Sequence, residues 1–154
     1  MNKKIAILTC LIAIATLSMS ISCAYATKPI PVSGSFSASL IPIPVKVAGN
    51  NVFFEHSGAG EWTGGISGST IAYHRWVAHT KIGVTNVHVE VIFSSATVAG
   101  QSGKLTILFL GKTTGLGVGS GTWRIISGSG GLANLKGGGT WGPGQYQGTV
   151  HFDP

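Results

Sequence analysis

The sequence has very little cysteine, and what it has lies near the N-terminus. Only Cys10 and Cys23 occur among the 154 residues, and both precede Ala26. If the chain is cut after Ala26, as argued below, the remaining domain has no thiol and no disulfide. A cysteine nucleophile, a thiolate metal site and covalent haem attachment are then excluded, and stability must come from the core and from backbone hydrogen bonds.

Acidic residues are almost as scarce. The four carboxylates are Glu55, Glu61, Glu90 and Asp153, against ten lysines and arginines, so the formal net charge is +6. Because the only aspartate is the penultimate residue, no Ser–His–Asp arrangement is arguable. The eight basic residues after position 26 are spread singly along the chain, so no groove that follows a phosphate backbone is expected. We therefore predict no nucleic-acid partner, and no motif predicts a cofactor.

Residues 1–26 have the pattern of a secretory signal peptide. A short basic region at positions 3 and 4 precedes a mainly apolar run over 5–21, and Ala-Tyr-Ala at 24–26 supplies small residues before a cleavage site. We predict cleavage after Ala26, which leaves one domain over 27–154 that is secreted or held at the cell surface. A retained membrane anchor is the alternative, since the run is about as long as a short spanning helix. After cleavage no stable membrane span is expected.

The part after position 26 lacks helix signals and holds all 24 glycines. No window has the sustained apolar period of three to four residues that indicates a helix. Alternation is common instead. The apolar residues of 87–93 (Val87, Val89, Val91 and Phe93) would point to one face of a strand, and His88, Glu90 and Ile92 to the other.

Short strands separated by glycine-rich turns predict an all-β fold. Besides 87–93, strands are expected over 33–40, 45–47, 51–55, 60–67, 70–82, 105–110, 121–126 and 145–152. Turns are expected at 49–51, 58–60, 99–103 and 115–121. About eight short strands are typical of a sandwich or barrel, and glycines within strands favour a closed antiparallel barrel. Trp62, Trp123 and Trp141 each stand near glycines, where we expect a strand to bend beneath the ring.

A glycine-rich segment over 127–139, Ser-Gly-Ser-Gly-Gly-Leu-Ala-Asn-Leu-Lys-Gly-Gly-Gly, resembles a motif of a known family. That family is an uncharacterised bacterial and archaeal one, related to the allene oxide cyclase and dirigent β-barrels. Segments 98–105 and 146–152 resemble its hairpin and its closing strand. The resemblance implies an allene oxide cyclase-like barrel. It carries no activity, because the shared motif is a turn and not the polar pocket residues of those proteins. Within the motif, Leu132 and Leu135 would form a short helical turn that plugs one end of the barrel.

Few residues are candidates for catalysis. His88 and Glu90 share one strand face and could act as acid and base, and Glu61 is a further candidate. The competing interpretation is a solvated strand face, because the neighbouring valines form an obvious core stripe. The sequence therefore identifies no catalytic site, and whether the protein is an enzyme stays open.

A second group of polar and aromatic residues lies over 74–79. On a regular strand His74 and Trp76 share one face and Arg75 and His79 the other, so these residues could line the mouth of a pocket, with Arg75 receiving a ligand carboxylate. An amphipathic exposed strand is the competing interpretation. The histidines have no spacing diagnostic of a metal site, so none is predicted.

These observations predict an exported β-barrel that binds a small hydrophobic ligand or serves as an interaction module. Association with further copies of the chain is a further expectation. The alternative is an isomerase or cyclase acting on a hydrophobic substrate inside the barrel. A buried Glu or His at the base of an interior cavity would favour the enzyme, whereas an interior filled by apolar side chains would leave binding to the rim.

Overall fold

The computed structural model describes residues 28–39, 43–114 and 118–154. The predicted signal peptide and both cysteines lie outside the described residues. The described part consists almost entirely of strands, which confirms the all-β prediction. The strands are β1 (Ile30–Ala38), β2 (Pro44–Ala48), β3 (Asn51–Gly64), β4 (Ile66–His79), β5 (Val84–Val98), β6 (Gln101–Thr114), β7 (Gly119–Gly128), β8 (Leu135–Gly142) and β9 (Gln145–Phe152).

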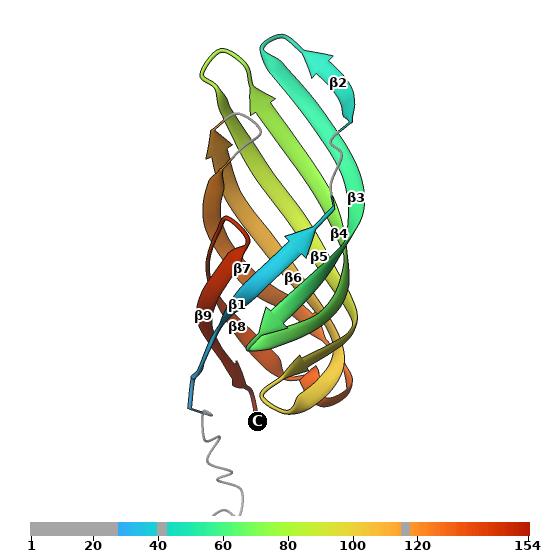
Figure 1. Ribbon diagram of the computed structural model, residues 1–154, viewed down its shortest axis with the longest axis vertical. Helices are drawn as coiled ribbons and strands as arrows, with labels where there is room; N and C mark the ends of the chain where they lie inside the picture. The colour runs from blue at the N-terminus through green and yellow to red at the C-terminus, as the bar shows by residue number, and fades with distance from the viewer. Residues whose placement is uncertain (1–27, 40–42, 115–117) are drawn as a thin grey trace, which may run out of the picture.

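All nine strands belong to one antiparallel sheet that closes on itself (Figure 1). Neighbours follow the order β1-β9-β8-β7-β6-β5-β4-β3-β2, and β1 also pairs with β3. This extra pairing joins every strand except β2 into a ring of eight, which is the barrel-like arrangement expected from the strand number. Closure pairs backbone N–H and C=O groups along the edges of β1 and β3, which would otherwise be exposed. Strand β2 is left as a short, fully exposed edge beside β3.

The ring is closed by β1 only over part of its height. Residues 34–38 of β1 pair with residues 60–64 of β3, whereas the beginning of β3 (51–54) pairs with β2. The beginning of β3, the end of β4 and the beginning of β5 therefore extend beyond the end of β1, as Figure 1 shows. We call the half where β1 meets β3 the closed end and the other half the open end.

The interior of the ring is lined by apolar side chains. On β5 the predicted alternation is confirmed, with Val87, Val89, Val91 and Phe93 buried and Ile92 exposed. A 3-10 turn η1 (Gly130–Leu132) places Leu132 in the core with 0 % exposure. The predicted plug is therefore present, except that its second leucine, at position 135, is the first residue of β8. The plug packs the closed end, and the cavity described below lies toward the open end.

The predicted turn at 58–60 is wrong. Strand β3 runs without interruption from Asn51 to Gly64, paired with β4 along its length, and the chain reverses at Gly64–Gly65 instead. Gly60 serves a close approach between strands, because a Cβ there would clash with the carbonyl oxygen of Ser37 on β1. The two short strands expected over 51–55 and 60–67 are thus one long strand and the turn that ends it.

Two of the tryptophan rings do cover glycines, but each glycine lies two strands away from its tryptophan in the sheet. A Cβ on Gly148 of β9 would lie 2.8 Å from Cζ2 of Trp123 on β7, and one on Gly111 of β6 would lie 2.5 Å from Cζ2 of Trp141 on β8. Trp62 stacks on Phe36, with ring centroids 5.4 Å apart. The expected bend under each ring is therefore a contact between strands, not a feature of one strand.

Candidate functional site

A cavity of about 200 Å³ lies inside the ring toward its open end. Trp62 separates it from the packed closed end, since this ring touches Phe93 of the core at 5.4 Å and Phe109 of the cavity wall at 5.5 Å between centroids. The wall is otherwise mainly apolar. Its side chains come from β1, β3, β4, β5, β6 and β8 and include Phe36, Ala72, Val87, Val89, Val91 and Trp141.

Two histidines and a tryptophan form a polar aromatic cluster in this interior, whose lining also includes Ser37, Thr70 and Thr113. His56 of β3 and His74 of β4 are directly opposite each other in the register of the hairpin. Their rings are stacked, with centroids 4.6 Å apart and planes 10° from parallel. Trp76 stands edge-on to both rings, at 5.0 Å from His56 and 5.6 Å from His74. His74 and Trp76 line the cavity directly.

The nitrogens of these three rings are buried and have no hydrogen-bond partner within the described residues. Both ring nitrogens of His56, both of His74 and the indole nitrogen of Trp76 are in this state. Leaving a buried polar group unpaired costs about 1–3 kcal/mol, and native proteins hold few such groups. Five unpaired nitrogens beside one cavity therefore lower the free energy of unfolding of this protein.

Burial also sets the charge of the cluster. Burial, together with the smaller effect of the neighbouring His56, lowers the pKa of His74 from its ordinary value of 6.5 to about 4. Burial lowers the pKa of His56 as well. No aspartate, glutamate, lysine or arginine of the described chain lines the cavity. The cavity is therefore neutral at physiological pH, and each imidazole offers one N–H donor and one bare nitrogen acceptor.

The four residues predicted to line a pocket lie on different faces of the sheet. His74 and Trp76 come together inside, as described, while Arg75 is exposed on the outer face, between Glu55 and His88 in the strand register. His79 is the last residue of β4, next to the turn that leads into β5. Its Nδ1 is 2.7 Å from Oδ1 of Asn51 and its Nε2 is 2.9 Å from Nδ2 of Asn86. Nδ1–H donates to the Asn51 oxygen and Nε2 accepts from the Asn86 amide, so His79 links β3, β4 and β5.

The three predicted catalytic candidates are not brought together. His88 and Glu90 lie on the outer face of β5, since they alternate with buried valines, and Glu90 is opposite Tyr73 and Leu108. Glu61 lies on the outer face of β3 near the closed end, opposite Ser69. The described residues hold no group of three or more His, Cys, Asp or Glu that could bind a metal ion.

Sequence reasoning missed His56. The turn expected at 58–60 separated this residue from the strand that carries His74, so their juxtaposition was not visible. The signal that would have found it is the Gly64–Gly65 pair. A hairpin that turns there places His56 directly across from His74.

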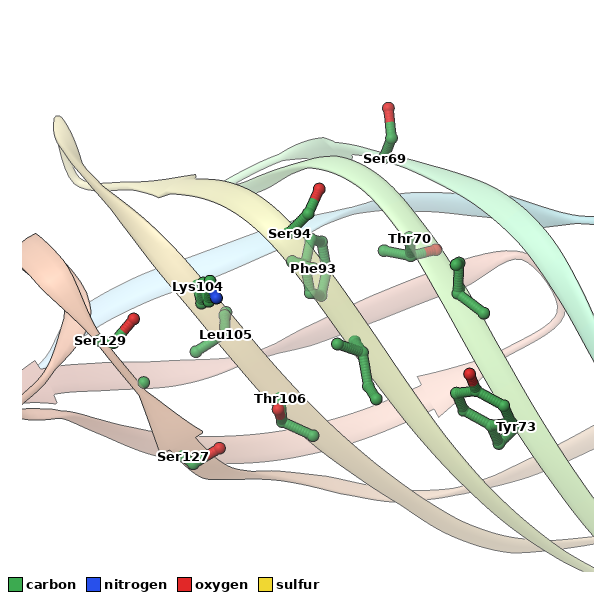
Figure 2. A pocket seen from close by; sticks show the side chains of 13 residues that line it. Ser69, Thr70, Tyr73, Phe93, Ser94, Lys104, Leu105, Thr106, Ser127 and Ser129 are labelled. Carbon is green, nitrogen blue, oxygen red and sulfur yellow. The ribbon is translucent and has the colours of Figure 1, made fainter.

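A second hollow lies on the outer surface, across β4 to β7 (Figure 2). Its volume is about 510 Å³. Shifts in strand register occur at neighbouring levels in the β4–β5, β5–β6 and β6–β7 pairs, and such bulges bend a sheet. Figure 2 shows the hydroxyl-bearing side chains of Ser94, Thr106 and Ser127 on three successive strands. Ser94 and Ser127 are exposed, so solvent satisfies their hydroxyls and the outer hollow carries no unpaired buried group.

Comparison with solved structures identifies a shared fold. The chain is similar to a protein of the DUF3224 family. That protein, of unknown function and from Shewanella oneidensis MR-1, superposes with a TM-score of 0.64 at 16 % sequence identity, over 82 % of this chain and 99 % of the other. No protein-family model matches the chain, and no curated protein matches it. The likeness supports an uncharacterised β-domain and shows no relation to allene oxide cyclase. No helix within the described residues is long and apolar enough to cross a membrane.

Proposed function

We propose that this protein binds a small, mainly apolar molecule in the cavity inside its strand ring. The observation that carries the proposal is the set of unpaired nitrogens of His56, His74 and Trp76 beside an otherwise apolar wall. An apolar pocket with a few convergent polar groups is the usual form of a small-molecule site. The outer hollow lacks this combination.

The cavity volume limits the size of the ligand. A buried apolar cavity of about 150 Å³ holds benzene, and sites for drug-sized ligands are about 300–1,000 Å³. At about 200 Å³, the cavity here fits a single substituted ring or a branched aliphatic of similar bulk. The open end of the ring, where β1 no longer covers β3, provides a route for entry.

Export of the domain is part of the same proposal and rests on the signal-peptide pattern of residues 1–26. A secreted or surface-held domain would meet its ligand outside the cytoplasm. Relation to the allene oxide cyclase and dirigent barrels stays a prediction, supported by the 127–139 motif and by segments 98–105 and 146–152.

An isomerase or cyclase inside the ring is a weaker candidate than a binding protein. The buried histidine that would favour an enzyme is present, but a pKa of about 4 makes His74 a weak base at neutral pH. No carboxylate of the described chain lines the cavity to assist it. Binding of a ligand, unlike acid–base catalysis, requires neither a charged histidine nor a carboxylate in the cavity.

The test is a titration with toluene, followed by the NMR methyl signals of the cavity valines, Val87, Val89 and Val91. We expect saturable shifts in the wild-type protein and a loss of affinity of tenfold or more in Ala72→Leu, because the added side chain fills the cavity. The matched control is Ala59→Leu, the same substitution on the exposed outer face of β3. Absence of saturable shifts, or equal loss in both variants, would refute the proposal.

A further inference from the structure

The ring nitrogens beside the cavity specify more than an apolar ligand. This inference rests on the proposed function, because it concerns what the bound molecule must offer to the polar part of the same cavity. Trp76 supplies one N–H donor and no acceptor. His74, when neutral, supplies one bare nitrogen that accepts and one N–H that donates. A group that pairs with Trp76 and with the bare nitrogen of His74 must therefore accept one hydrogen bond and donate another.

We propose that the ligand is an uncharged alcohol or phenol whose hydroxyl is held by Trp76 and His74. In this arrangement Nε1–H of Trp76 donates to the hydroxyl oxygen, and the hydroxyl proton is donated to the bare ring nitrogen of His74. The apolar body of the ligand lies against Ala72, Phe109 and the valines of β5. One unpaired nitrogen of each of these two residues gains a partner at once.

Other polar groups fit less well. A ketone or aldehyde oxygen can accept from Nε1–H of Trp76 and from the N–H of His74, but it has no proton to donate to the bare ring nitrogen of His74. A carboxylate would enter a cavity that no lysine or arginine of the described chain lines, so its charge would lose water without gaining a counter-ion. An ammonium group would lack a carboxylate in the same way.

His56 has a positioning role in this scheme. Its ring stacks on His74 and does not line the cavity, so it fixes the plane of the His74 ring without touching the ligand. The five nitrogens are covered by neighbouring side chains, so a hydroxyl reaches those of Trp76 and His74 only after the covering side chains move aside.

The experiment compares phenol with toluene, which differ by a hydroxyl in place of a methyl group. For each protein the dissociation constants of both are measured by titration at pH 7.5, and their ratio expresses the preference for the hydroxyl. One neutral hydrogen bond is worth about 0.5–1.5 kcal/mol, so we expect the preference to fall by up to about tenfold in His74→Leu. In Trp76→Phe, which removes only the N–H donor and some ring area, we expect a fall of several-fold.

The control is His88→Leu, the same substitution on the outer face of β5, which should leave the preference unchanged. If both compounds bind but neither variant changes the preference, the hydroxyl assignment is overturned while the binding function stands. Tighter binding of benzoate than of phenol to the wild-type protein would also overturn it. If neither toluene nor phenol binds, the proposed function itself fails.

Discussion

Replacing His74 by leucine should make the protein more stable. The imidazole is 7 % exposed and both its nitrogens are unpaired, which costs about 1–3 kcal/mol relative to an apolar side chain of similar size. The variant loses the ring contacts with His56 and Trp76, which are worth about 0.5–1.5 kcal/mol. The net expectation is a gain of about 1 kcal/mol at pH 7.5, measured by urea unfolding.

The gain should increase as the pH falls. Because burial lowers the pKa of His74 to about 4 in the folded state, against 6.5 when unfolded, the folded protein binds fewer protons between these values. The contribution of His74 to the free energy of unfolding is therefore fully present above pH 6.5, and it is lost as the pH falls toward 4. At pH 4.5 this loss amounts to about 1–2.5 kcal/mol, once screening by water at the open end is allowed for.

Urea unfolding of the two proteins at pH 7.5 and 4.5 separates this effect from other titrations, because the variant differs only at position 74. His88→Leu provides the matched control on the outer face and should change stability by less than about 0.5 kcal/mol. A destabilised His74→Leu protein, or an advantage that does not grow between pH 7.5 and 4.5, would refute the reasoning.

Three further substitutions test how the ring is held together. Tyr146→Phe should destabilise the fold by about 1–3 kcal/mol, because the backbone N–H of Ile66, 2.7 Å from the phenol oxygen, loses its acceptor. The control Tyr73→Phe on the outer face should have little effect, and equal unfolding midpoints for the two variants would contradict the prediction. Leu132→Ala should cost about 2–5 kcal/mol in chemical denaturation, since it opens a cavity in the plug; a loss below 1 kcal/mol would show that the plug is dispensable. Gly60→Ala should lower the thermal unfolding midpoint by several degrees, because the added Cβ would clash with a carbonyl oxygen of β1. An unchanged midpoint would show that β1 does not approach Gly60 so closely.

The all-β class and the strand faces could be predicted because a period of two leaves a direct mark on the sequence. The alternation over 87–93 predicted which side chains of β5 are buried, and the motif at 127–139 predicted the turn that carries Leu132. Both signals are local. Each depends on residues close together in the chain and needs no knowledge of pairing.

The candidate site could not be predicted because it depends on register. Gly58 and Gly60 look like turn residues, yet β3 continues through both, and the glycine at position 60 serves a close approach of β1. Only the true turn at Gly64–Gly65 sets His56 against His74. Glycine has both uses, and the sequence alone does not distinguish a turn from a crowded strand crossing.

Ring closure is non-local in the same way. Strand β1 meets β3 near the beginning of the described chain and β9 at its end, so both partners of one strand lie far apart in sequence. No periodicity in any window reports such pairing. The open end, and with it the cavity, follows from where that pairing stops.

The central claim is that the interior of the ring, and not its outer surface, is the binding site. A crystal structure of the protein with phenol tests this most directly. The account predicts phenol inside the ring, with its oxygen within hydrogen-bond distance of Nε1 of Trp76 and a ring nitrogen of His74. Phenol in the outer hollow of β4 to β7, with the interior cavity free of it, would contradict the account.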